Sequence, residues 1–367
     1  MKLSLNVPIN SVSFGQVSIA LLKEIFYRSM FSDGIDLSIF PIGQVDLSSQ
    51  SNVDEDFNIW LDKILKNSPL THSRKTPSLK LWHLNGGFES FSEKQLLLSF
   101  YELDGPTLPE KTIAKDNLTV FTSEYTVETF REHGVDTHYV PLGFDKHNFN
   151  ILDKDYHNED KIVFNLTGKF EKRKNHHKTI RAWARKYGND KRFSLQCAIW
   201  NNFMPEDQNR SLFNNLLEGK EYFNIQFLGY MPNNSVYNDY LNSSHVIIGM
   251  SGGEGWGLPE FQSVALGKHS VILNCSGYKG WSDNINSVLV EPSGKEEVYD
   301  GMFFNRGAPF NQGNIFTFDE DAFIEGCEKA IKRVEINKVN EDGLILQERF
   351  TYSGTLDLLL KQLENLQ

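Results

Sequence analysis

The sequence has little cysteine, and its cysteines are poorly placed for cross-links. Its 367 residues include Cys197, Cys275 and Cys327, an odd number with no CxxC pair. Disulfide frameworks and structural zinc sites need paired or closely spaced cysteines. We therefore expect three ordinary reduced thiols, and neither a disulfide nor a zinc site.

Long apolar runs are also missing. No stretch approaches the ~18 consecutive apolar residues of a membrane-spanning helix. The first residues, Met1 to Pro8, lack the apolar core and the cleavage site of a signal peptide. We expect a cytoplasmic protein without stable membrane insertion, and the sequence leaves its oligomeric state open.

An excess of positive charge is absent too. The net charge is −11, and residues 1 to 150 contain 13 Lys and Arg against 19 Asp and Glu. Contact with a nucleic-acid backbone needs a broad basic surface, and docking on anionic lipid needs a basic amphipathic helix. The charge balance therefore argues against nucleic acid and anionic membranes as partners.

What the chain does contain is enough apolar material for two cores. Hydrophobic residues make up 40% of it, and its length suits two domains. Short apolar runs typical of strands alternate with helix-like segments from residue 3 to 141 and again from 161 to 274, an order typical of α/β layers with mainly parallel sheets. Residues 144 to 160 are polar and unpatterned, as in a linker.

We predict two Rossmann-like, doubly wound α/β domains that face each other across a cleft. The first covers residues 1–150 and the second residues 151–345. Residues 346–367 are expected to form a C-terminal helix that packs back toward the first domain. In open α/β sheets, ligands bind beyond the carboxyl ends of the strands, so the loops that follow the strands are the candidate sites.

The clearest motif is a glycine-rich loop between a predicted strand and a predicted helix, IIGMSGGEGWGLPEFQSVALG at residues 247–267. Glycines let the backbone turn tightly and approach a ligand, and the unpaired N–H groups at the helix start can solvate a diphosphate. Glu254 would present a carboxylate to a hydroxylated ligand. The alternative, a plain tight turn, would need fewer glycines and no isolated acid.

This segment resembles the donor-site motif of glycosyltransferase family 4, Glu-Gly-Phe-Gly-Leu-Pro-x-x-Glu-Ala-Met-Ala-x-Gly. Trp256 replaces the Phe of the motif. Its second Glu, which holds the ribose hydroxyls in the family, falls on Gln262; Gln can accept the hydrogen bond but lacks the charge. The residues that match in register are Glu254, Gly255, Gly257, Leu258, Pro259, Ala265 and Gly267.

The resemblance implies the GT-B fold and a retaining glycosyltransferase, a hexosyltransferase of the EC 2.4 class. It implies that Glu254 positions the transferred sugar. It also places the following residues in the donor site: Gly253, Gly255, Trp256, Gly257, Leu258 and Gln262.

A second match is FNLTGKFEKRKNH at residues 164–176. Lys169 and Lys174 occupy the positions at which family members hold the phosphates of the donor. Two fixed cations there would stabilise the charge that the diphosphate gains as the glycosidic bond breaks. The same residues would also fit a solvated basic face with Lys172 and Arg173.

Weaker matches complete the expected donor site. Tyr230 and Met231 lie in a segment that resembles the cradle of the nucleotide base. Gly15 and Gln16 follow the first predicted strand, where the family has a glycine loop near the donor; a simple capped turn is the alternative.

Three residues of the first domain point to the reacting groups. His83 precedes a Gly-Gly pair at a strand end, where many family members place a His near the transferred sugar, and an ordinary exposed or core histidine fits as well. Glu102 and Asp104 follow the next strand and would line the acceptor pocket, or simply form a turn before Pro106.

No metal or cofactor is expected. Adjacent His176 and His177 on a helix would point apart and lack partners, and Asp153-Lys154-Asp155, which resembles the DxD metal motif, lies in the predicted linker. The lysines and the helix N-terminus would supply the positive potential instead. The expected substrates are a nucleotide sugar, with UDP or GDP as the nucleotide, and a glycan, glycolipid or small-molecule acceptor.

Other functions remain open on the sequence. A catalytically silent nucleotide-sugar or glycan binding protein is favoured by Gln262. Other GT-B enzymes, such as an epimerase or a phosphorylase with lysine-linked pyridoxal phosphate, would share the fold. A DNA-glucosylating enzyme would need to bind duplex DNA, against which the acidic first domain argues.

Overall fold

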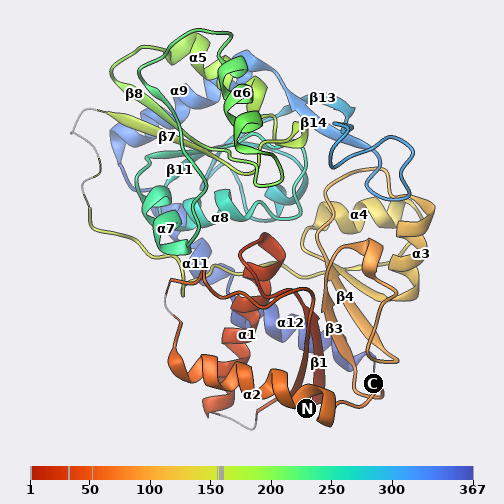
Figure 1. The fold of residues 1–367 in the computed structure, drawn as a ribbon. Coiled ribbons are helices and arrows are strands. Elements are labelled where there is room, and N and C mark those ends of the chain that lie inside the picture. The colour runs from red at the N-terminus through yellow and green to blue at the C-terminus, as the bar shows by residue number, and fades with distance from the viewer. Residues whose placement is uncertain (1, 32–33, 52, 155, 157–160, 367) are drawn as a thin grey trace.

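The computed structural model describes residues 2–31, 34–51, 53–154, 156 and 161–366 (Figure 1). Two lobes, one built on each of two parallel sheets, make up the molecule. The strands of the first sheet are β1 (Lys2–Val7), β2 (Asp36–Pro41), β3 (Ser78–Leu81), β4 (Gln95–Ser99), β5 (Leu118–Phe121) and β6 (His138–Tyr139). Those of the second are β7 (Ile162–Thr167), β8 (Phe193–Ala198), β9 (Ile225–Phe227), β10 (Val246–Gly249), β11 (His269–Leu273) and β12 (Val288–Val290).

Helices surround both sheets. In the first lobe they are α1 (Ser13–Phe31), α2 (Glu55–Thr71), α3 (Leu108–Asp116) and α4 (Glu124–Glu132). Those around the second sheet are α5 (His176–Tyr187), α6 (Glu206–Leu216), α7 (Asn234–Asn242), α8 (Leu258–Ala265) and α9 (Glu320–Ile336). The chain ends with α10 (Glu341–Leu344), α11 (Leu346–Arg349) and α12 (Tyr352–Glu364).

Both sheets are parallel throughout, with strand orders β2-β1-β3-β4-β5-β6 and β12-β11-β10-β7-β8-β9. Their central strands are short apolar runs: residues 96–98 of β4 and 246–248 of β10 are fully buried. Such strands are stable only when helices cover both faces of the sheet. The predicted fold class, two doubly wound α/β domains, is confirmed.

The chain returns to the first lobe at its C-terminal end. Helix α12 packs against α1, and Arg28 of α1 forms an ion pair with Asp357 at 2.6 Å. The backbone N–H of Phe144 donates to the carbonyl of Phe350 at 2.8 Å. Phe144 lies where the chain leaves the first lobe, and Phe350 lies where it returns. The two connections between the lobes therefore run side by side.

A hairpin of the second half of the chain also reaches the first lobe. Strands β13 (Pro292–Glu297) and β14 (Asn314–Phe318) are antiparallel, and Figure 1 shows the connection between them extending toward α3 and α4. Its buried residues Phe304 and Ile315 share an apolar cluster with Ile113 and Phe130. The two lobes are therefore in contact on both sides of the space between them.

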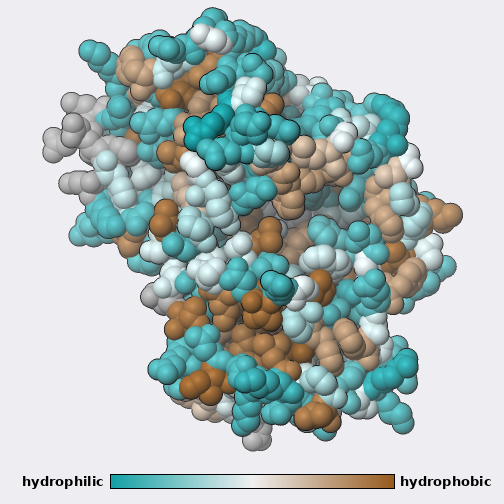
Figure 2. Space-filling view, viewed as in Figure 1, coloured by the Kyte–Doolittle hydropathy of each residue, from teal (hydrophilic) through white to brown (hydrophobic). Residues whose placement is uncertain are grey.

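The outer surface is mixed in character. Figure 2 shows mainly hydrophilic residues on the second lobe and a gathering of hydrophobic residues on the first, where Figure 1 places α1. Among the described residues, no helix has the length and apolar character to cross a membrane.

Candidate active site

A cleft of about 300 Å³ opens between the lobes at the carboxyl ends of the strands. This is the edge at which open α/β sheets bind ligands. Its walls come from the loop before α1, the end of β4, the loop between β7 and α5, and the loop between β10 and α8. The lining residues that carry charge are Glu102, Lys169, Glu171, Arg173, Lys174 and Glu254.

The glycine-rich loop forms one wall of this cleft and leads into α8. Gly257, the residue before α8, has φ +80°, and a Cβ there would lie 2.3 Å from the ring of Tyr278. Only glycine satisfies both the left-handed backbone and this contact. Leu258 and Pro259, the first two residues of α8, line the cleft, so the N-terminus of this helix lies at the cleft, where an anion site at a helix N-terminus would be.

Two further glycines of the loop permit close contact between the lobes. A Cβ on Gly253 would lie 2.5 Å from the carbonyl oxygen of Glu102, and one on Gly255 would lie 2.8 Å from Cβ of Phe100. The hydroxyl of Thr122 donates to the carbonyl of Gly255 at 2.8 Å. Glycine at these positions thus has a structural role across the lobes in addition to any contact with a ligand.

Lys174 and Glu254 lie together on the floor of the cleft. Lys174 Nζ donates to Glu254 Oε1 at 2.5 Å, and both side chains are more than nine-tenths buried. Burial opposes ionisation of Glu254, but Lys174 and Arg173 outweigh it and lower its pKa to about 2. The loop before α5 and the loop before α8 are therefore joined by a fully ionised pair.

Arg173 is the central cation of the site, and the sequence did not single it out. Its guanidinium lies 3.1 Å from Glu254 and 2.5 Å from Glu171, and it donates to the carbonyl of Gly253. Arg173 Nε also lies 3.2 Å from Glu102 Oε2, as an ion pair without hydrogen-bond geometry. The sequence does show a basic run in this strand-to-helix loop. The ion pairs of Arg173 could not be predicted from it, because Glu102 and Glu254 come close to Arg173 only in the folded protein.

Lys169 is the more accessible of the two predicted phosphate ligands. Its side chain is 32% exposed, and Nζ lies 3.1 Å from Glu171 Oε2. The ammonium also sits 3.7 Å from the ring centroid of Phe303, a residue of the β13–β14 connection. Both lysines line the cleft, Lys169 with its side chain partly exposed and Lys174 with its side chain buried.

The two acids predicted to line the acceptor pocket occupy different places. Glu102 lines the cleft, and burial, together with repulsion from Glu254 and Glu171, raises its pKa to about 7 despite the attraction of Arg173. Asp104 instead pairs with Lys295 at 2.9 Å and accepts the backbone N–H of Asn314 at 2.7 Å. Asp104 therefore anchors the β13–β14 hairpin and is outside the residues that line the cleft.

His83 lies at the end of β3, exposed in a smaller cavity that adjoins the cleft. Its ring packs against Phe14 at a centroid distance of 4.5 Å. Desolvation and the positive charge of Lys169 lower the pKa of His83. A neutral imidazole next to the predicted phosphate site can donate one hydrogen bond from one ring nitrogen and accept one at the other.

Gly15 and Gln16 support the loop before α1 and do not line the cleft. A Cβ on Gly15 would lie 2.3 Å from the carbonyl oxygen of Asn10, so glycine is needed for the loop to fold back on the helix. Gln16 donates to Ser49 and accepts from Asn234 of the second lobe at 3.0 Å. Its side chain is thereby engaged in a contact between the lobes, while Ser11 to Ser13 reach the cleft.

Trp256 and Leu258 line the cleft, but Trp256 is 2% exposed and packs on Phe261 and Phe350. Gln262 is 4% exposed and its Oε1 has no hydrogen-bond partner among the described residues. The predicted ribose contact thus lies beneath the surface, outside the lining of the cleft.

The segment predicted to cradle the nucleotide base follows β9. Tyr230 is 49% exposed, and Met231 packs partly against the core. Neither residue lines the cleft, and both remain predicted donor contacts.

Glu260 is a buried acid that the sequence did not single out. It lies in the first turn of α8 and is 2% exposed. Burial, with repulsion from Glu254, raises its pKa to about 7 against the attraction of Lys174. The ionisation of Glu260 therefore depends on the charges of Lys174 and Glu254.

Residues that could bind a metal are not clustered in the part of the chain that the structure describes: no group of three or more His, Cys, Asp or Glu is placed to hold one. His176 is buried, with Nε2 3.2 Å from the carbonyl of Thr167. The DxD-like triplet ends at residue 155, which lies outside the described residues.

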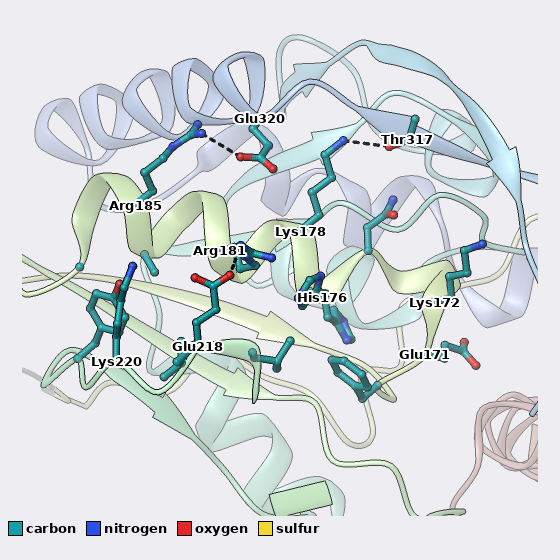
Figure 3. A pocket seen from close by; sticks show the side chains of 18 of the residues that line it. Glu171, Lys172, His176, Lys178, Arg181, Arg185, Glu218, Lys220, Thr317 and Glu320 are labelled. Atoms are coloured by element: carbon teal, nitrogen blue, oxygen red, sulfur yellow. Dashed lines mark hydrogen bonds and ion pairs between the residues drawn. The ribbon is translucent and has the colours of Figure 1, made fainter. Parts of the chain in front are cut away.

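A larger hollow, about 1180 Å³, lies elsewhere, on the outer side of the second lobe (Figure 3). Side chains of α5 point into it, but its cations are paired with neighbours: Arg185 with Glu320 at 3.1 Å, and Arg181 with Glu218. Lys178 donates to Thr317 at 3.1 Å. At one end this open groove reaches the loop after β7, where Glu171 lines both it and the cleft, but the cations named here are engaged by neighbouring side chains.

No family model matches the chain, and a search of curated proteins finds no match. Solved structures do match over its whole length. Sucrose-phosphate synthase from Thermosynechococcus elongatus is 13% identical with a TM-score of 0.67, and 100% of this chain and 98% of that chain are covered. A glycosyltransferase from Rickettsia africae ESF-5 is 14% identical with a TM-score of 0.68 and the same coverage.

HepE from Anabaena, solved in complex with UDP-glucose, is 14% identical, with a TM-score of 0.64 and 100% of both chains covered. At such identities the similarity concerns the fold. The two facing parallel sheets, with the cleft at their carboxyl edges, have the arrangement of these structures. The chain therefore has the GT-B fold.

Proposed function

We propose that the protein is a retaining glycosyltransferase of the family 4 type, which transfers a hexose from a nucleoside diphosphate sugar to a hydroxylated acceptor. The observation that carries the proposal is the convergence of Lys174, Glu254 and Lys169 in the cleft, with Lys174 Nζ 2.5 Å from Glu254. Residues 151–345 bind the donor and residues 1–150 the acceptor. The match to HepE in complex with UDP-glucose supports a UDP-sugar donor.

Each group has a defined task in this reaction. The acceptor oxygen bonds to the anomeric carbon on the face from which the nucleoside diphosphate leaves. The bond from that carbon to the phosphate oxygen breaks, and the hydroxyl proton passes to the same phosphate oxygen. Lys169 and Lys174 stabilise the charge on the leaving diphosphate, Glu254 positions the sugar and His83 contacts it. The reaction requires neither a metal nor a cofactor.

The competing proposal is nucleotide-sugar binding without transfer. It is favoured by Gln262, which lacks the charge of the family residue and is buried away from the cleft. The two functions share a binding site and differ only in turnover, so affinity alone does not distinguish them.

A thermal-shift panel of UDP-, GDP-, ADP- and TDP-sugars identifies the donor. A ligand present at 100 times its dissociation constant stabilises the folded protein by ~2.7 kcal/mol. Incubation of that donor with candidate acceptors, followed by assay of nucleoside diphosphate and NMR of the product anomer, then tests transfer and retention. An inverted anomer would contradict the retaining mechanism, and tight binding without turnover would favour the competing proposal.

A further inference from the structure

A small cavity of about 140 Å³ adjoins the cleft on the side of the first lobe. Phe100 lines both spaces, so they meet at this ring. The cavity is well below the roughly 300–1,000 Å³ typical of sites for drug-sized ligands. Its polar lining residues are His83, Asn85, Ser99, Tyr101, Glu110 and Asn311.

The buried hydroxyl of Ser99 is the main unexplained group in this cavity. Ser99 is 1% exposed, and its Oγ has no hydrogen-bond partner among the residues described. A buried hydroxyl without a partner is costly, and such groups are usually paired with protein, water or ligand. A ligand hydroxyl in the cavity would supply the missing partner.

The remaining walls suit a ring that has apolar faces and polar edges. Phe100 stacks on Phe14 at a centroid distance of 4.3 Å and gives an apolar wall. His83 and Asn85, both exposed, add polar groups at the rim. The described lining contains no lysine or arginine, and it contains the carboxylate of Glu110. This composition favours a neutral ligand over a phosphorylated or carboxylated one.

The second lobe closes the cavity. Phe310 and Asn311 of the β13–β14 connection form part of its wall. The backbone N–H of Asn311 donates to Glu110 Oε1 at 2.7 Å, and the hydroxyl of Thr107 donates to the carbonyl of Pro309 at 2.6 Å. The site is therefore complete only while the two lobes are joined here.

We propose that this cavity is the acceptor subsite and that it takes a single neutral hydroxylated ring, bound by the Ser99 hydroxyl and covered by Asn311. The inference rests on the proposed function, because it assigns the acceptor of that reaction. Acceptor choice is then set partly by the β13–β14 connection of the second domain, and not by the first domain alone.

Two variants alter the cavity while leaving the proposed donor residues in place. Ser99→Val removes the hydroxyl and fills space; its control is Ser270→Val, since Ser270 of β11 is also 1% exposed with an unpartnered hydroxyl but does not line the cavity. Asn311→Gly removes only a side chain. Asn311 is exposed and has φ +58°, which glycine adopts without strain, and its N–H contact to Glu110 is retained.

Saturation-transfer NMR with methyl glucoside, methyl galactoside, methyl N-acetylglucosaminide and glucose 6-phosphate, in the presence of UDP or GDP, tests the proposal. We expect the wild type and Ser270→Val to bind at least one neutral glycoside, and both cavity variants to bind it about fivefold or more weakly, as loss of one hydrogen bond predicts. UDP or GDP should bind all four proteins equally.

Equal glycoside binding by Ser99→Val and Asn311→Gly would overturn the proposal, as would preferential binding of glucose 6-phosphate. If UDP or GDP binds but no glycoside does, the acceptor subsite is wrong and the proposed donor site stands. If neither nucleotide nor glycoside binds, the proposed function fails, and the subsite with it.

Discussion

Arg173 Nε lies 3.2 Å from Glu102 Oε2, so a buried cation of the second domain pairs with a carboxylate of the first. The same guanidinium pairs with Glu171 and Glu254. Removing one partner from a buried ion cluster leaves charges without compensation and costs ~3–5 kcal/mol. We expect Arg173→Gln to lower the free energy of unfolding by that amount in urea titrations.

Arg185→Gln is the matched control for this variant. Arg185 also pairs with two acids, Glu320 and Asp321, but its side chain is 55% exposed. An exposed pair contributes ~0–1 kcal/mol, so this variant should remain near wild-type stability. Equal losses in both variants would show that the cluster around Arg173 is not a buried electrostatic unit.

Stability should depend on pH through Glu102. Its pKa is raised from 4.5 to about 7, so between these values the folded protein holds a proton that the unfolded chain has released. The free energy of unfolding therefore falls as pH rises through this window. Glu102→Gln should reduce the fall measured in urea between about pH 5 and about pH 7. Part of the pH dependence should remain in Glu102→Gln, because the pKa of Glu260 is raised as well. If the free energy of unfolding of Glu102→Gln changes with pH as steeply as that of the wild type, the raised pKa of Glu102 is contradicted.

Close contact between the lobes requires Gly255. A Cβ there would lie 2.8 Å from Cβ of Phe100, a distance that forces the backbone to move. We expect Gly255→Ala to lower the free energy of unfolding by ~1–3 kcal/mol, as overpacking does, and to reduce nucleotide affinity. Gly294→Ala is the control, because its Cβ would meet only Thr317 Cγ2, at 4.0 Å. Wild-type values for Gly255→Ala would argue against a closed cleft in solution.

The three cysteines should be inert in the folded protein. All are buried, and burial raises the pKa of each thiol, to about 12 for Cys275. Thiol reagents attack the thiolate, so we expect no labelling of the native protein and three labels after unfolding. Rapid labelling of native protein would place at least one thiol at the surface.

Regular α/β alternation was predictable from local pattern. Within the alternating pattern, residues 176–187 are helix-like and match the bounds of α5, and the strand-like run 96–101 overlaps β4, which ends at Ser99. Helix α2 at residues 55–71 was not predicted. Its apolar pattern is weak, because it buries only Phe57, Leu61 and Ser68, and it contains Pro69. The β13–β14 hairpin was also missed, since residues 293–297 of β13 are exposed and its neighbours are distant in sequence.

The site was predictable only in part. Glycine spacing and two lysines pointed to the loops that meet at the cleft, because these features are local in sequence. The role of Arg173 could not be predicted from the sequence, because its ion-pair partners come from both lobes. Asp104 and Gln16 could not be placed for the same reason: both lie close to the cleft in sequence, but contacts with the other lobe occupy their side chains.

The most direct test of glycosyl transfer is release of nucleoside diphosphate from the donor in the presence of acceptor. Lys174→Ala and Glu254→Ala should lower kcat about 100-fold or more, because each removes a charge that acts in the transition state. Lys172→Ala is the control, since this neighbouring lysine contacts the carbonyl of Glu297 and does not line the cleft. We predict turnover by the wild-type protein and by Lys172→Ala, and loss of turnover in both cleft variants. The account is contradicted if the wild-type protein turns over none of the donors that it binds, or if Lys174→Ala keeps full activity.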